Sequence, residues 1–131
     1  MTANAPARTE GSVAIRRGGI FWLTPDVSRG SAPGPAHPHV VLQDDVFNRS
    51  RIRSVIVCAL TSNLKRVNEP GNVLLDVGEG NLPKRSVVVV SQLESVDKSQ
   101  LGPYIGALSD QRVQQIVDGI RFQQASFFEG R

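Results

Sequence analysis

The sequence predicts an α+β fold that is mostly β: a small, strongly curved antiparallel sheet or barrel with an amphipathic helix near its C-terminal end. Three observations predict it. Short runs rich in β-branched residues recur along the chain, clusters of glycine, proline and asparagine separate them, and only the last segment has helical periodicity. A parallel doubly wound sheet needs helices between its strands, so that class is disfavoured. A length of 131 residues suits one domain.

The β-rich runs are each expected to form a strand. In chain order they are residues 20–23, 39–43, 54–61, 73–77, 86–96 and 103–108. The run 86–96 is either one strand or two strands on either side of a bend near Ser91. The run 54–61 is apolar on both faces and is expected in the middle of the sheet, whereas 103–108 is expected at an edge. Single helical turns are expected at 46–50 and 96–101.

The segment that follows residue 108 predicts the one substantial helix, which fades near Ser126. Its apolar stripe has the spacing of one helical face and consists of Val113, Ile116, Val117 and Ile120. The Ser109 hydroxyl can accept from the free amides of the first turn, and Asp110 suits the positive end of the helix dipole. Gly119 lowers the helix propensity of this segment slightly.

We expect a single folded domain at residues 15–126, between a flexible leader at 1–14 and a flexible tail at 127–131. Within it, the proline- and glycine-rich residues 25–38 predict a long loop, of the kind that often serves as a lid or binding loop. No apolar run is long enough for a membrane span, and no signal peptide is recognisable. The lone cysteine, Cys58, lies in an apolar strand and is expected to be buried and inert, which fits a cytoplasmic protein.

The chain is mildly basic, with a formal net charge of +3 and an isoelectric point near 9.6. The positive charge gathers in residues 46–70, where the only acidic residue is Glu69. The basic residues of this region are Arg49, Arg51, Arg53, Lys65 and Arg66. Either this is a solvated loop face or it attracts a polyanionic partner.

Few residues suggest chemistry without further information. His37 and His39 flank Pro38 at the end of the long loop, and imidazole is the side chain best suited to proton transfer near neutral pH. Either ring can equally be a plain loop or strand residue, and the pair does not indicate a metal site. The adjacent Asp44 and Asp45 are expected to cap a turn. Aromatic residues are too sparse for a stacking platform, and Trp22 is expected in the core.

Residues 61–63 (Thr-Ser-Asn) close the central strand. Hydroxyl groups at a strand end can contact phosphate oxygens, or they can bond the local backbone. Together with the loop end at Pro38 and the basic charge of 46–70, they are expected to form one concave site for an anionic ligand, and a phosphodiester substrate is plausible.

The order of several segments resembles the MazF/PemK toxins over roughly residues 16–122. The opening Arg17-Gly18-Gly19-Ile20-Phe21-Trp22-Leu23 is similar to their first strand, and Gly30-Ser31 to the start of their Gly-Ser-Glu-Gln loop. The stretch from Pro38 to Asp45 with Asn48-Arg49 resembles their second strand, and Val55 to Asn63 resembles a third strand that ends in Leu-Thr-Ser-Asn. Further matches are Gly71-Asn72-Val73, Gly80 to Val87, Gln92, Val96-Asp97-Lys98 and Ile105 to Leu108.

This resemblance implies a barrel-like domain, SH3-like and of the CcdB/PemK type, that forms a homodimer. It also implies a metal- and cofactor-independent endoribonuclease for single-stranded RNA, in which the ribose 2′-hydroxyl attacks the adjacent phosphorus and leaves a 2′,3′-cyclic phosphate and a 5′-hydroxyl. A MazE-like antitoxin would bind through an acidic disordered segment.

The residues of the family site carry over with departures. The threonine or serine that bonds the scissile phosphate falls on Thr61, and the catalytic arginine falls on His37, a better acid or base but a weaker phosphate ligand. The Glu-Gln of the loop is replaced by Ala32-Pro33. RNA contacts are expected from Arg29, Ser31, Asn48, Arg49, Ser62, Asn63, Lys65 and Gln92.

Two other readings stay open. The departures allow a catalytically weakened relative that binds an antitoxin or RNA without cutting it. A gyrase-poisoning relative is a third possibility because the same fold is used in that way, although the Leu-Thr-Ser-Asn and arginine-rich segments fit RNA better.

Overall fold

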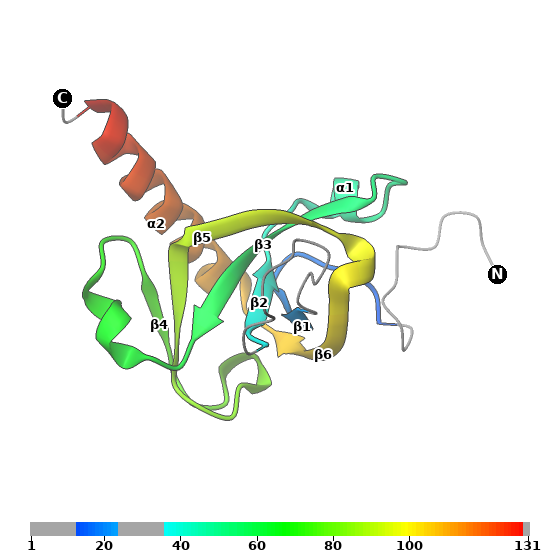
Figure 1. Cartoon of the computed structure of the whole chain (residues 1–131), viewed down its shortest axis with the longest axis horizontal. Coiled ribbons are helices and arrows are strands. Elements are labelled where there is room, and N and C mark those ends of the chain that lie inside the picture. The colour runs from blue at the N-terminus through cyan, green and yellow to red at the C-terminus, as the bar shows by residue number, and fades with distance from the viewer. Residues whose placement is uncertain (1–12, 24–35, 130–131) are drawn as a thin grey trace, which may run out of the picture.

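The computed structural model describes residues 13–23 and 36–129 and shows one antiparallel sheet with a long helix beside it (Figure 1). The strands are β1 (Gly19–Leu23), β2 (Pro38–Val41), β3 (Ser54–Thr61), β4 (Val73–Leu75), β5 (Ser86–Asp97) and β6 (Leu101–Ala107). The helices are α1 (Asp45–Asn48), α2 (Asp110–Glu129) and three 3₁₀ turns, η2 (Leu64–Asn68), η3 (Glu79–Asn81) and η4 (Lys98–Gln100). None of the described helices is long and apolar enough to cross a membrane.

The strand order is β4-β5-β3-β2-β1-β6, and every pairing is antiparallel. The predicted mixed, mostly β class, the central position of β3 and the edge position of β6 are confirmed. Of the two predicted alternatives, a sheet or a barrel, the structure shows the sheet, because the described pairings leave it open at β4 and β6. The helix α2 begins where the Ser109 cap predicts, and the Arg112 amide lies 3.2 Å from the Ser109 hydroxyl oxygen.

Residues 86–97 form the single strand β5, with an irregularity at the predicted bend. Cys58 of β3 pairs with Leu93, whereas Leu60, only two residues further on, pairs with Val88. Three extra residues of β5 are therefore accommodated opposite Ala59, and this places Ser91 and Gln92 outside the regular ladder. The first half of β5 also pairs with β4.

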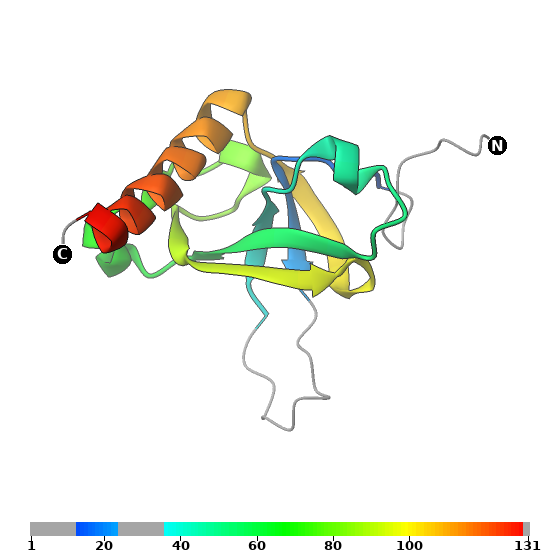
Figure 2. The same ribbon diagram turned by 90° about the horizontal axis from the view of Figure 1, so that it is seen from above.

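Two apolar clusters lie on the opposite faces of the sheet. The first packs one face against α2 through Val113 and Ile116, with Val117 and Ile120 at its margin, as the periodicity predicts (Figure 2). The second lies on the other face and includes Phe21, Val41 and Val57. Successive side chains of each central strand point alternately into one cluster and the other, which explains why β3 is apolar on both faces.

A close contact between two glycines fixes α2 against the loop that precedes β4. A Cβ atom on Gly119 would lie 2.1 Å from the carbonyl oxygen of Gly71. Gly71 itself has a φ of +85°, a left-handed conformation that favours glycine. Gly119 therefore lowers helix propensity but permits the helix and the loop to touch.

The short helix α1 lies near the start of β3, at the other end of this strand from Thr61, and is held by polar contacts. The Asp44 carboxylate accepts from the Val46 amide at 2.8 Å, which confirms the predicted cap. The Lys98 ammonium donates to the carbonyl oxygens of Phe47, Asn48 and Ser50 at 3.1–3.4 Å, and burial lowers the pKa of Lys98.

Candidate functional site

The antiparallel pairing of β2 and β3 brings the two predicted catalytic residues to the same end of the sheet. His39 pairs with Ala59, so that His37, just before β2, and Thr61, at the end of β3, lie at corresponding levels. The His37 side chain is exposed, and that of Thr61 is half-buried. Two cavities open beside this end of the sheet.

The larger cavity is apolar, with a volume of about 380 Å³. Its walls come from the ends of β1, β2 and β3 and from the loop before β5; they are Trp22, Ala36, His37, Pro38, Leu60, Ser62, Leu82, Pro83, Lys84, Ser86 and Ile105. The expectation of a core position for Trp22 is wrong, because its side chain is 39% exposed and lines this cavity. Strand alternation buries its neighbour Phe21 on the other face instead.

The smaller cavity, about 300 Å³, also borders His37 and is named the polar cavity because most of its lining residues are polar. Its lining residues are His37, His39, Ala59, Gln92, Leu93 and Glu94. Gln92 lies in the irregular part of β5, directly before Leu93, which pairs with Cys58. His37 thus borders an apolar cavity and a polar one.

The ring of His39 is almost fully buried, with 8% of its surface exposed. Its Nδ1 lies 2.9 Å from the His37 carbonyl oxygen, and its Nε2 lies 3.8 Å from Oε1 of Glu94. Burial lowers the pKa of His39, against the smaller opposing effects of the His37 carbonyl and the Glu94 carboxylate. His39 is therefore a neutral imidazole near pH 7.

The end of β3 shows the local bonding that hydroxyl and amide groups commonly make at strand ends. The Thr61 hydroxyl accepts from the Asn63 amide at 3.1 Å, and the Asn63 side chain accepts from the Lys65 amide at 3.2 Å to cap η2. The Thr61 hydroxyl still has its own hydrogen to donate, since it uses only a lone pair here. Ser62, Asn63 and Lys65 are all exposed around this end of the sheet.

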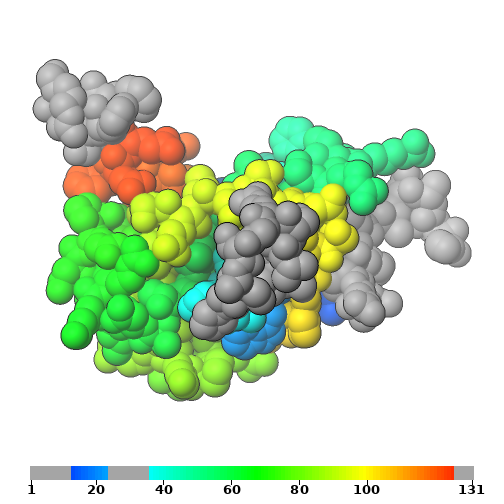
Figure 3. Space-filling view, in the orientation of Figure 1, coloured from blue at the N-terminus to red at the C-terminus, as the bar shows by residue number. Residues whose placement is uncertain are grey.

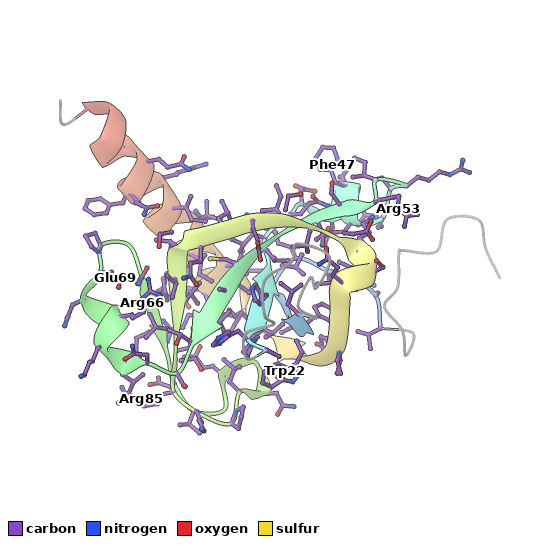
Figure 4. The ribbon with its side chains drawn as sticks, in the orientation of Figure 1. Trp22, Phe47, Arg53, Arg66, Glu69 and Arg85 are labelled. Atoms are coloured by element: carbon purple, nitrogen blue, oxygen red, sulfur yellow. The ribbon has the colours of Figure 1, made fainter. Side chains whose placement is uncertain are left out.

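The basic residues of 46–70 do not form one site, contrary to expectation. Arg49 and Arg51 precede β3, whereas Lys65 and Arg66 follow it, and the eight-residue strand separates the two groups by roughly 23 Å. Figure 3 shows α1 and the segment after it at the edge of the molecule opposite residues 61–75. In Figure 4, Arg53 lies with Phe47 at one end of the sheet, and Arg66 and Arg85 at the other.

Ion pairs reduce this charge further. Arg66 makes a two-pronged ion pair with Glu69 at 2.9 and 3.0 Å, and Arg53 lies 3.4 Å from Asp97. The hydrogen bonds that Arg66 donates lower the pKa of Glu69, and the pKa of Asp97 is lowered mainly by the Ser99 amide.

An RNA contact by Asn48 is not supported, because its side chain is fully buried. Its amide nitrogen donates to the Gln43 carbonyl at 2.8 Å and to Asp45 at 3.1 Å, and its oxygen accepts from the Gln43 side chain at 3.1 Å. Asn48 thus ties α1 to the end of β2. Arg49 is exposed but lies at this same remote end, and the predicted contacts Arg29 and Ser31 lie outside the described residues.

Two residues of the site were missed by the sequence analysis. Lys84 is an exposed cation on the rim of the apolar cavity, and its Pro83-Lys84 setting was the available signal. Glu94 has no sequence signal, because its proximity to His39 depends on the pairing of β5 with β3. Within the described ranges, no three histidine, cysteine or acidic residues gather closely enough to hold a metal ion.

Comparison with known proteins gives consistent matches. The family model described as PemK-like, MazF-like toxin of type II toxin–antitoxin system matches residues 16–123. Endoribonuclease MazF6 of Mycobacterium tuberculosis is 32% identical over 109 residues, which cover 83% of this chain and 96% of the relative. Endoribonuclease MazF of Staphylococcus saprophyticus is 28% identical over 106 residues, covering 81% and 88%.

Solved structures resemble the fold. MazF from Deinococcus radiodurans has a TM-score of 0.66 at 20% identity, covering 85% of this chain and 96% of that one. A mycobacterial endoribonuclease in complex with its cognate antitoxin has a TM-score of 0.65 at 20% identity, covering 82% and 92%. At such identities the likeness concerns the fold alone.

Proposed function

Because the chain belongs to the PemK-like, MazF-like toxins of type II toxin–antitoxin systems, we propose that it is a toxin that cleaves single-stranded RNA and is neutralised by a cognate antitoxin. The observation that carries this proposal is the position of His37. It lies level with Thr61 and between an apolar and a polar cavity at one end of the sheet. Relatives over most of the chain are named endoribonucleases.

In the proposed reaction, the 2′-oxygen forms a bond to phosphorus as the bond from phosphorus to the 5′-oxygen breaks. The 2′-hydroxyl proton must go to a base, and the leaving 5′-oxygen must receive one. His37 exchanges a proton with one of the two reacting oxygens, and the Thr61 hydroxyl donates to a phosphate oxygen. No step needs a metal ion. DNA lacks the attacking hydroxyl and is not a substrate.

The RNA strand is proposed to cross the end of the sheet, with one base in the apolar cavity. The cavity volume of about 380 Å³ lies in the range of small-molecule sites, and Trp22 offers a ring for stacking. Lys84 lies at the rim and can pair with a phosphate. Ser62, Asn63, Lys65 and Gln92 supply further contacts along the strand.

The partners follow from the surface at both ends of the sheet. The exposed basic residues Arg49, Arg51 and Lys65 suit an acidic segment of the antitoxin. We also propose a homodimer in the cytoplasm, supported by the exposed apolar side chains around α1. These are Val46, Phe47, Ile52 and Ile56, each at least 40% exposed.

The test is cleavage of a long single-stranded RNA by the purified full-length chain in the presence of EDTA. We expect His37→Ala and Thr61→Ala each to lose most activity, while the matched Thr61→Ser keeps the hydroxyl and most of the rate. If the wild type leaves RNA intact over a range of pH and substrates, the competing view of a non-cutting RNA- or antitoxin-binding protein is correct. Cutting that survives both alanine substitutions would show that the site is assigned wrongly.

A further inference from the structure

A second imidazole lines the polar cavity beside His37. His39 belongs to an otherwise apolar stretch of β2, where it is followed by the fully buried Val40 and Val41. A polar ring in such a place is costly unless it is bonded, and the His39 ring makes a hydrogen bond from Nδ1 to the His37 carbonyl, with the Glu94 carboxylate 3.8 Å from Nε2. Both rings, together with Gln92 and Glu94, border one cavity of about 300 Å³.

The hydrogen bond at Nδ1 fixes the tautomer of the neutral His39 ring. A carbonyl oxygen can only accept, so the Nδ1 atom must carry the hydrogen that it donates to the His37 carbonyl at 2.9 Å. In the neutral ring, Nε2 then has an unshared electron pair. This nitrogen points toward the side of the ring where Glu94 lies, 3.8 Å away.

The surroundings of the ring suit a base. Burial in the sheet lowers the pKa of His39 and keeps it ready to accept a proton near neutral pH. Its strand neighbours Phe21 and Ala59 are uncharged. The ionisable groups that act on it are Glu94 from β5 and His37 from the preceding segment. A carboxylate beside Nε2 stabilises the imidazolium that forms when the proton is taken.

One imidazole cannot serve both ends of the reaction at once. In a displacement at phosphorus, the attacking and leaving oxygens lie on opposite sides, so proton removal and proton delivery need two groups. A site with His37 alone lacks one of them. His39, with Glu94 beside it, lines the same cavity as His37 and can supply the second group.

We propose that His39 removes the proton of the attacking 2′-hydroxyl, with Glu94 positioning and stabilising its ring, while the exposed His37 delivers a proton to the leaving 5′-oxygen. This inference rests on the proposed RNA cleavage. The O2′–P bond forms and the P–O5′ bond breaks. One proton passes to His39 and one leaves His37, and solvent restores both rings afterwards.

The test separates the two roles with two RNA oligonucleotides of one cleaved sequence, one of them carrying sulfur in place of the leaving 5′-oxygen. A thiolate leaves without a proton. With the ordinary RNA, His37→Ala and His39→Gln are each expected to cut roughly 10²- to 10⁴-fold more slowly. With the sulfur substrate, His37→Ala is expected to recover to within about tenfold of wild type, whereas His39→Gln stays slow.

Additional readouts distinguish chemistry from folding. His39→Ala creates a space in which added imidazole is expected to restore part of the rate, and circular dichroism checks the fold of each variant. The wild-type rate is expected to fall as the pH drops through the pKa of His39. Glu94→Gln is expected to move this fall to lower pH, because the Glu94 carboxylate raises the pKa of His39 and the ring becomes a weaker base without it.

The outcomes are distinguishable. If the wild type cuts but folded His39→Gln keeps its rate, the inference is wrong and the proposed function stands. If the sulfur substrate rescues His39→Gln rather than His37→Ala, the roles are reversed and the inference is overturned. If the wild type does not cut, the proposed function fails and this inference fails with it.

Discussion

Replacement of Gly119 by alanine is a sharp test of the packing between α2 and the loop before β4. In an ordinary helix interior this change stabilises by about 1 kcal/mol, because alanine has the higher helix propensity. Here the new Cβ would meet the Gly71 carbonyl oxygen at 2.1 Å and its carbon at 3.0 Å. Both are backbone atoms of a residue with a φ of +85°, so the helix and the loop must move apart by roughly 1 Å.

Overpacking of this kind costs up to about 3 kcal/mol, so after the gain in helix propensity we expect a net loss of about 2 kcal/mol. The assay is urea unfolding followed by circular dichroism at one fixed protein concentration. Gln124→Ala, at an exposed position of the same helix, is the matched control and is expected to change stability by less than about 0.5 kcal/mol. An increase in stability for Gly119→Ala would refute the close contact.

Three further predictions concern the cavity, an ion pair and the thiol. Trp22→Ala is expected to weaken binding of an RNA with a 2′-O-methyl group at the cleaved position by about 1–3 kcal/mol, whereas Phe122→Ala, exposed on α2, leaves fluorescence anisotropy titrations unchanged. Glu79→Gln removes the contacts of Glu79 with Arg112 at 2.6 and 2.8 Å and is expected to cost about 1–2 kcal/mol at pH 7. Arg112 lowers the pKa of Glu79 in the folded protein, so this loss in the free energy of unfolding persists above about pH 4.3. The loss disappears as the pH falls through the pKa that Glu79 has in the folded protein. A loss that is independent of pH in urea unfolding would contradict the ion pair. Burial raises the pKa of Cys58 to about 12, so a thiol reagent at pH 8 is expected to label only unfolded protein, and immediate labelling of the native chain would disprove the burial.

The fold was predictable where one pattern repeats over many residues. The run 54–61 has the bounds of β3, and the apolar stripe of α2 contacts the first cluster as expected. Whether the sheet closes was not predictable, because closure depends on pairing between edge strands that local sequence does not encode. The exposure of Trp22 was missed for a related reason: in a short apolar strand, alternation alone does not reveal which face opens into a cavity.

The site was predictable only in part. His37 and Thr61 lie level because neighbouring antiparallel strands bring a beginning and an end together. Asn48 was misassigned because its role depends on bonds to Gln43 and Asp45 that form only once α1 is folded. Glu94 reaches His39 across the intervening strand β3, where it pairs with Val57, and residue spacing does not contain such a contact between strands.

The chemistry of the RNA ends tests the central claim most directly. A single-stranded RNA is incubated with the purified chain in EDTA, and the fragments are sequenced from their 5′ ends and weighed by mass spectrometry. The account predicts cuts at one short recurring sequence, each leaving a 2′,3′-cyclic phosphate and a 5′-hydroxyl, and no cut where the ribose at that position is replaced by deoxyribose. Fragments with 5′-phosphate and 3′-hydroxyl ends, or cutting at the deoxyribose position, would contradict attack by the 2′-hydroxyl.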